Sequence, residues 1–305
     1  MPDYGHDLIF GAFITPQNRR PADVVALAQA AERAGLDLIG LQDHPYHPGF
    51  LDTWTLLSYV AAKTERVRLS GYVLNLMMRP PAVLARAAAS LDLLSGGRFE
   101  MAIGPGESLA VEAIGAMGGS PRTPGQSLDA LGEAIDIFRG TWDASAPGPL
   151  DVDGQYYKVH EAPRGPKPAH DIAIWIPAGG PRGRKLVGRK ADGWIAAGLI
   201  MTDPYREVAE GNAMIDEAAL EAGRDPRAIQ RLYDSPGTFG PTRRGYLQGP
   251  PEQWVDDLLP LAVERGVSGF TLVSDDPRAI ERYGREVAPA LREALARERG
   301  RAVSA

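Results

Sequence analysis

Short apolar runs alternate along this chain with longer segments in which apolar residues recur three and four positions apart. The short runs are typical of buried strands, and the longer segments are typical of amphipathic helices, several of which open with Pro and close with Gly. The strand pattern occupies residues 7–14, 36–42, 67–76, 98–104, 172–178, 193–198, 229–235, where it is weakest, and 269–274. About eight consecutive βα units favour a (β/α)₈ barrel over a doubly wound sheet.

One stretch, residues 143–170, interrupts the alternation and is rich in Gly and Pro. Within it, "DVDGQYYKV" predicts a short hairpin with an Asp-Gly turn. We therefore expect an insertion between the fourth and fifth barrel strands, lying over one mouth of the barrel. It is either a mobile surface loop or a functional element, namely a lid or a wall of the substrate pocket.

Length and composition narrow the possible functions. A chain of 305 residues is consistent with one barrel domain over 1–305. The net charge of −6 argues against nucleic acid or an anionic membrane as the main partner and favours a small-molecule substrate. The chain has no cysteine, which excludes disulfides and thiolate chemistry. No apolar run is long enough to span a bilayer or resembles an export signal, so we expect a cytoplasmic protein.

Two of the five histidines lie in "GLQDHPYHPG", residues 40–49, directly after the second predicted strand. Active sites of (β/α)₈ barrels lie at the carboxyl ends of the strands, so this stretch should face the mouth. Asp43, His44 and His47 could bind a metal, but no further ligands follow other strands, and we predict no metal site. A histidine bonded within the turn is a second possibility. We favour a third, a pocket histidine that exchanges a proton near neutral pH.

Two strand-to-helix junctions contain glycines suited to ligand binding. In "RFEMAIGPGES", residues 98–108, Gly104 and Gly106 would let backbone approach a ligand, with Glu107 at the rim. In "IWIPAGGPRGRKLVGRKADGW", residues 174–194, amides of Gly179 and Gly180 at a helix start could bind an anion, with Arg182 or Arg184 nearby. Neither is a complete dinucleotide-binding or P-loop motif, and either could be a plain turn.

Taken together, these segments resemble the bacterial luciferase-like flavin-dependent oxidoreductases. The resemblance covers nearly the full chain, through "ADVVALAQAAERAGLDLIGLQDH", "VRLSGYVLNLMMRPPAVLARAAASLDLLSGGRFEMAIGPG", "DGQYYKV", "IWIPAGGPRGRKLVGRKADGW", "GRDPRAI" and "GPPEQWVDDLLPLAVERGVSGF". It implies a (β/α)₈ barrel that uses FMN or the deazaflavin coenzyme F420, and commonly a homodimer formed through the helix "VLARAAASLDLLSGG" and the one before it.

The resemblance also implies roles for individual residues. His44 would lie by the reactive face of the ring. A bulge supporting the ring, often with a non-proline cis peptide, would fall at Tyr72 and Val73. The other matching positions are Asn75 at the ring or its side chain, Gly104, Pro105 and Gly106 along the ribityl chain, and Ala178, Gly179, Gly180 and Pro181 at the phosphate.

The choice of cofactor sets the expected reaction. "AGGP" and the acid Glu107 after the Gly-Pro-Gly turn resemble the deazaflavin branch, in which the matching acid has been assigned proton donation. We therefore favour F420 and hydride transfer to or from a small organic substrate, with His44 and Glu107 as catalytic residues. The alternatives are an FMN-dependent monooxygenase that activates O₂, a barrel lyase or isomerase that binds a substrate phosphate at "AGGP", and a non-catalytic flavin-binding barrel.

Overall fold

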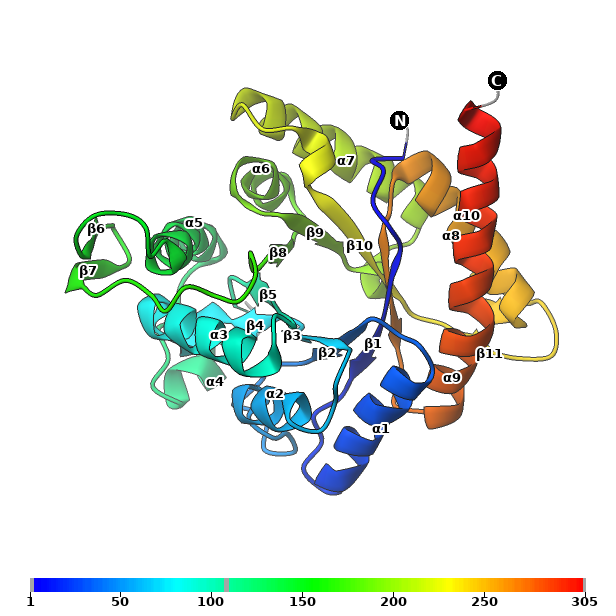
Figure 1. The fold of residues 1–305 in the computed structure, drawn as a ribbon, viewed down its shortest axis with the longest axis horizontal. Coiled ribbons are helices and arrows are strands. Elements are labelled where there is room, and N and C mark those ends of the chain that lie inside the picture. The colour runs from blue at the N-terminus through cyan, green and yellow to red at the C-terminus, as the bar shows by residue number, and fades with distance from the viewer. Residues whose placement is uncertain (1–2, 107–109, 304–305) are drawn as a thin grey trace.

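A closed ring of parallel strands forms the centre of the protein (Figure 1). The computed structural model describes residues 3–106 and 110–303. The strands follow the order β3-β2-β1-β13-β10-β9-β8-β5-β4, and pairing of β3 with β5 closes the ring. Their bounds are β1 (Ile9–Ile14), β2 (Leu38–Leu41), β3 (Arg68–Gly71), β4 (Leu74–Asn75), β5 (Phe99–Gly104), β8 (Ile174–Pro177), β9 (Gly193–Ala196), β10 (Gln230–Ser235) and β13 (Gly269–Val273). Since β3 and β4 are two halves of one barrel strand, the predicted (β/α)₈ barrel is confirmed.

Helices surround the ring and connect successive strands (Figure 1). Their bounds are α1 (Pro21–Arg33), α2 (Thr53–Ala61), α3 (Pro81–Ser95), α4 (Val111–Ala116), α5 (Pro124–Trp142), α6 (Pro181–Lys190), α7 (Pro204–Glu221), α8 (Pro251–Arg265), α9 (Pro277–Arg282) and α10 (Ala288–Val303), with short helical turns at η1 (Leu76–Met78), η3 (Gly198–Ile200), η4 (Pro226–Ala228) and η5 (Tyr283–Val287). The expected helix-end signals are confirmed at α3 and α8. Both begin with Pro and end at a left-handed glycine, Gly96 with φ 72° and Gly266 with φ 66°.

Apolar side chains fill both faces of the barrel wall. The outer faces of the strands pack against the helices in one large core. The inner faces form a smaller cluster, made of Leu38, Tyr72, Ala102, Trp175, Ile195 and Leu232. This burial on both faces explains why the strands appear in the sequence as nearly continuous apolar runs. Among the described residues, no helix is long and apolar enough to cross a membrane.

The third barrel strand is interrupted near its carboxyl end. The sequence pattern predicted one strand over 67–76, whereas β3 and β4 are separated by Tyr72 and Val73. The peptide bond between these two residues is cis, a geometry that the family resemblance made possible at this bond but that the sequence left open. The interruption turns Val73 and Leu74 toward a pocket described below.

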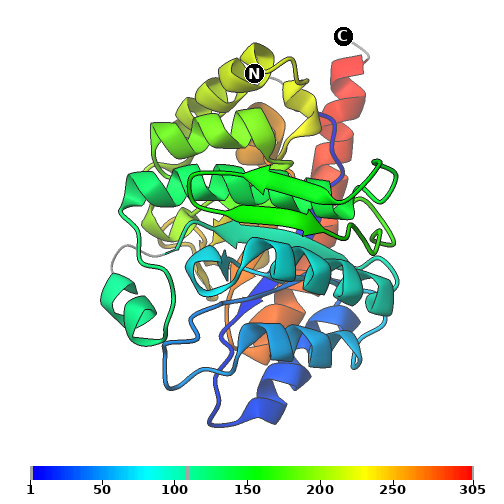
Figure 2. The same ribbon diagram turned by 90° about the vertical axis from the view of Figure 1, so that its left-hand side faces the viewer.

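The insertion is confirmed between the fourth and fifth barrel strands, but its position differs from our expectation. It contains an antiparallel hairpin of β6 (Leu150–Asp153) and β7 (Lys158–Ala162). Figure 2 shows this hairpin along the outer flank of the barrel, where Leu150 and Val159 pack with Ile137 of α5. The apolar face of the hairpin is thus buried on a helix, so the prediction that the insertion lies over a mouth is wrong for its strands.

The hairpin turn also differs from the prediction. Asp153 pairs with Lys158, so residues 154–157 form a longer connection than an Asp-Gly turn. The Glu133 carboxylate on α5 accepts hydrogen bonds from the backbone N–H groups of residues 155, 156 and 157. This anchor leaves Tyr156 and Tyr157 beside Arg122, near the loop that follows β4. Only the turn of the insertion therefore approaches the carboxyl end of the barrel.

Candidate active site

A small pocket lies at the carboxyl ends of the first barrel strands. It encloses about 150 Å³. Its lining consists of Asp43, His44, Val73, Leu74, Asn75, Gly104, Pro105, Gly106 and Pro177. The structure thus brings together most of the residues that the sequence singled out from three separate segments. This is the end of the barrel at which (β/α)₈ enzymes place their active sites.

Asp43 connects two of the loops that form this pocket. Its carboxylate is fully buried, and Oδ2 accepts a hydrogen bond of 3.0 Å from the backbone N–H of Asn75. Arg79 donates to Oδ1 of Asp43 at 3.1 Å and also to Asp52 at 3.0 Å. The Asn75 side chain in turn accepts from the backbone N–H of Met77 at 3.1 Å. Sequence reasoning considered Asp43 only as a metal ligand, although an acid directly after a barrel strand is a signal for such a link.

The two histidines of residues 40–49 have different surroundings. His44 is half-buried and lines the pocket, and its Nδ1 lies 2.7 Å from the hydroxyl of Tyr46. His47 is exposed, its ring stacks on Phe50 with centroids 4.1 Å apart, and its Nδ1 accepts from the N–H of Gly49. In the described ranges no group of three or more His, Asp or Glu side chains is arranged for a metal ion. Of the two, His44 has the position required of a pocket acid or base.

The Gly-Pro-Gly turn after β5 packs closely against the bulge. A Cβ on Gly104 would lie 2.8 Å from Cγ2 of Val73, and one on Gly106 would lie 2.7 Å from Cγ of Met77. Gly106 also has φ 98°, which favours glycine. The local packing therefore favours glycine at both positions, independently of any ligand. Glu107, the second expected catalytic residue, lies outside the described residues.

The turn after β8 presents open backbone at the start of α6. Gly180 is the N-cap residue, with φ −106°, and Pro181 occupies the first turn. A Cβ on Gly179 or Gly180 would meet no atom within 4 Å. The carbonyl of Ala178 accepts a hydrogen bond of 2.9 Å from Nε1 of Trp194, which fixes the turn to β9. Since Pro177 lines the pocket, this helix start directly adjoins it and can receive an anionic group.

The two arginines near this turn differ in burial and in their contacts. Arg182 is exposed and pairs with Asp129 at 2.8 Å. Arg184 is buried, with its guanidinium carbon 5.5 Å from the ring centroid of Trp194. Its Nε has no hydrogen-bond partner within residues 3–106 and 110–303. A buried donor without a partner is unusual, which makes Arg184 the better candidate to support an anion at the turn.

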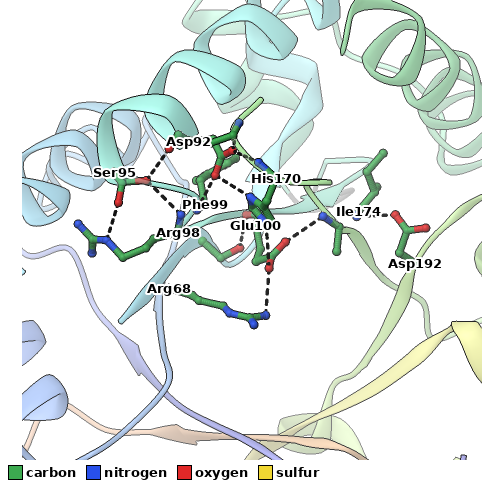
Figure 3. Close-up of polar contacts among 12 residues, drawn as sticks. Arg68, Asp92, Ser95, Arg98, Phe99, Glu100, His170, Ile174 and Asp192 are labelled. Atoms are coloured by element: carbon green, nitrogen blue, oxygen red, sulfur yellow. Dashed lines mark hydrogen bonds and ion pairs between the residues drawn. The ribbon is translucent and has the colours of Figure 1, made fainter. Parts of the chain in front are cut away.

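A second polar cluster lies at the opposite, amino end of the barrel (Figure 3). His170 contacts Asp92 through Nδ1 at 2.9 Å and Glu100 through Nε2 at 3.4 Å. Glu100 also pairs with Arg68 at 3.1 Å and accepts from the N–H of Ala173. Hydrogen bonds to the two carboxylates raise the pKa of His170 to about 10. These side chains form hydrogen bonds and ion pairs with one another, far from the candidate site. We therefore infer that the cluster stabilises the fold.

A parallel barrel with a pocket at the carboxyl strand ends and an open helix start beside it is typical of proteins that bind a phosphorylated ligand there. Comparison with known proteins identifies the family. The chain belongs to the luciferase-like monooxygenase family, whose model matches residues 9–245.

Named relatives within this family depend on F420. An F420-dependent glucose-6-phosphate dehydrogenase of Nocardia farcinica is 31% identical, over 75% of this chain and 68% of the relative. Another, from Beutenbergia cavernae, is 31% identical over 92% of this chain and 95% of the relative. Among solved structures, an F420-dependent secondary alcohol dehydrogenase in complex with an F420-acetone adduct superposes with a TM-score of 0.80 at 21% identity, covering 94% of this chain and 99% of that one. At that identity the likeness supports the fold alone.

Proposed function

We propose that this protein is an F420-dependent oxidoreductase that transfers hydride between the deazaflavin and a small organic substrate. The observation that carries the proposal is the adjacency of the His44 pocket and the open turn at residues 178–181. The ring system of a phosphorylated flavin-type cofactor would occupy the first, and its phosphate would occupy the second. The F420 dependence of the named relatives supports the choice of deazaflavin over FMN.

The residues present fit such a cofactor. Gly179 and Gly180 leave space beside the backbone in which a phosphate would be held by amides at the α6 start, with Arg184 close by. Asn75 and the Gly104–Gly106 turn would contact the ring and the ribityl chain. A bound deazaflavin supplies the hydride donor or acceptor and does not activate oxygen.

His44 would exchange the proton that accompanies hydride transfer. Its Nδ1 is engaged with the Tyr46 hydroxyl, so we assign proton exchange with the substrate oxygen to Nε2. The Tyr46 contact would fix the orientation of the ring, as a hydrogen bond at the second nitrogen commonly does. The role of Glu107 as a second proton donor rests on the family resemblance and is likewise a proposal.

Cofactor titration tests this function. F420 and FMN are added separately to the cofactor-free protein, and binding is followed by absorbance and fluorescence. We expect F420 to bind with the higher affinity. Reduced F420 should not be reoxidised by O₂ faster with the protein than without it, whereas oxidised F420 should be reduced by one member of a substrate panel containing glucose 6-phosphate and secondary alcohols. Preferential FMN binding with oxygen-dependent turnover would instead support the monooxygenase alternative.

We further propose that the protein is a homodimer formed through α2 and α3. These neighbouring helices expose large apolar side chains, with Tyr59 54%, Val83 66% and Leu94 87% accessible. Exposed apolar surface of this kind is typical of protein interfaces. Light scattering should give a particle of about twice the 32.7 kDa chain mass, and Leu94→Glu should reduce it to the monomer. The proposed compartment is the cytoplasm, which rests on the sequence pattern alone.

A further inference from the structure

A buried acid inside the barrel has no role in the proposed chemistry. Asp234 lies near the carboxyl end of β10, opposite Thr271 of β13, and is only 6% exposed. Its Oδ1 has no hydrogen-bond partner among the described residues. The same holds for the hydroxyl of Tyr72, which is 5% exposed. Buried polar atoms without partners are destabilising and are commonly found at functional sites.

Tyr72 connects this acid to the candidate cofactor pocket. It immediately precedes Val73, which lines the pocket. Its ring is packed against Phe13, with centroids 5.5 Å apart, and a Cβ on Gly40 would lie 2.8 Å from the Cβ of Tyr72. The phenol is thus confined to the barrel interior, close enough to Asp234 for the two groups to influence each other's pKa. A change at the phenol would be transmitted directly to the backbone of the bulge.

We propose that Asp234, in its protonated form, is a positioning residue for the cofactor pocket and acts through Tyr72. The neutral acid and the phenol can share a hydrogen bond across the barrel interior after a small adjustment, which would hold the Tyr72–Val73 bulge in the shape that accepts the ring. An ionised Asp234 would place an unpaired charge in an apolar barrel and would favour water entry beneath the ring.

Burial keeps Asp234 mostly protonated below neutral pH. Burial raises its pKa to about 7, against a smaller lowering by the Tyr72 hydroxyl. Asp234 faces Tyr72 from the bulge and its register partner Thr271 on β13, and Tyr233 is its neighbour on the outer face of β10. Only the two tyrosines titrate, and burial raises the pKa of both far above neutral. Asp234 is therefore the group of this set that changes charge between mildly acidic and mildly basic pH.

Cofactor binding should be linked to this ionisation. A ring system that covers the carboxyl end of the barrel removes water from above Asp234 and so disfavours its charged form further. Because linkage is reciprocal, the cofactor must then bind more weakly to the protein in which Asp234 is ionised. F420 affinity should decrease as pH rises through the pKa of Asp234.

The test rests on the proposed function and measures F420 affinity by fluorescence at about pH 6 and about pH 8.5, either side of the acid's pKa. Ionisation of F420 itself affects the affinity of every variant equally. The readout is therefore the dissociation constant of Asp234→Asn divided by that of the parent, measured at the same pH. Asn mimics the neutral acid. We expect this ratio to be close to unity at the lower pH and to fall at least about threefold at the higher pH. The same change should appear in a His44→Gln background, because His44 is a separate group.

Two further measurements separate this proposal from a purely structural role. Tyr72→Phe removes the hydroxyl through which Asp234 is proposed to act, so in a Tyr72→Phe background the pH dependence of the affinity ratio between Asp234→Asn and its parent should become smaller. In cofactor-free protein, Asp234→Asn should become more stable relative to the parent between about pH 4 and pH 7, since the unfolded acid ionises first. A ratio independent of pH would overturn the inference while leaving the proposed function intact. Absence of F420 binding at every pH would instead reject the proposed function.

Discussion

The Asp43 carboxylate accepts a hydrogen bond of 3.0 Å from the backbone N–H of Asn75 and thereby joins the loop after β2 to the bulged third strand. The contact is fully buried on the Asp43 side and is shared with Arg79. His44 follows Asp43 directly, so one carboxylate holds the proposed proton-exchanging residue and the bulge in a fixed relation. We infer that the shape of the pocket depends on Asp43, which lines the pocket and holds these two segments together.

Replacement of Asp43 tests this relation. Asp43→Ala removes the acceptor from Asn75 and one partner from Arg79, and should lower the free energy of unfolding by about 2 to 3 kcal/mol. F420 affinity should also fall, since the bulge loses its anchor. The matched control is Asp52→Ala, which removes the other partner of Arg79 and the α2 cap at a cost of about 1 kcal/mol. Urea unfolding and cofactor titration measure both effects, and equal losses of affinity in the two variants would contradict the assignment.

Gly180 provides a test of the phosphate-binding turn. Its φ of −106° is accessible to any residue, and a Cβ there would meet no atom within 4 Å. Gly180→Val should therefore fold with little change in thermal stability but should weaken F420 binding at least about tenfold, because the side chain occupies the space beside the amides. Gly180→Ala should give a smaller loss. Unchanged affinity in the valine variant would place the phosphate elsewhere.

His44 and His47 form a matched pair for testing proton exchange. His44→Ala and His44→Asn should fold normally and bind F420 within a few-fold of the parent, while turnover falls at least about tenfold, because general acid-base groups contribute at this scale or above. His47→Ala should retain turnover, since His47 is exposed and its ring contacts Phe50 and Gly49 of its own loop. An inactive His47 variant with an active His44 variant would reverse our assignment.

The amino-end cluster predicts a pH dependence of stability. The pKa of His170 is raised to about 10 in the folded protein by its bonds to Asp92 and Glu100, against about 6.5 for an unperturbed histidine. Its contribution to stability is therefore complete below about pH 6.5 and is lost as the pH rises toward the folded pKa. The stability difference between the parent and His170→Gln should be larger at about pH 6.5 than at about pH 10. A difference that stays constant in urea unfolding would show that His170 does not titrate in this way.

The sequence alone determined the barrel, the order of its strands and the strand-to-helix turns that line the candidate site. Buried parallel strands and their flanking helices have strong periodic patterns, and glycine turns follow strands at recognisable positions. The weakest predicted strand, 229–235, nonetheless forms a full strand, β10. Buried polar residues interrupt the apolar pattern of this strand. Their burial could not be predicted, because the groups that they contact lie in other segments of the chain. Arg231, for example, is buried against Asp216 of α7, which also accepts a hydrogen bond from Tyr4.

Only the tertiary structure decided which polar groups meet. The sequence placed Asp43 beside His44 but could not show that Asn75 and Arg79 converge on its carboxylate. It gave no sign that Asp234 faces Tyr72 inside the barrel. The hairpin pattern was recognisable, but its packing against α5 depends on which helix face lies opposite. The local pattern of apolar and polar residues indicates which face of each segment is buried. Contacts between segments depend on barrel closure, which brings residues far apart in sequence to the same strand ends.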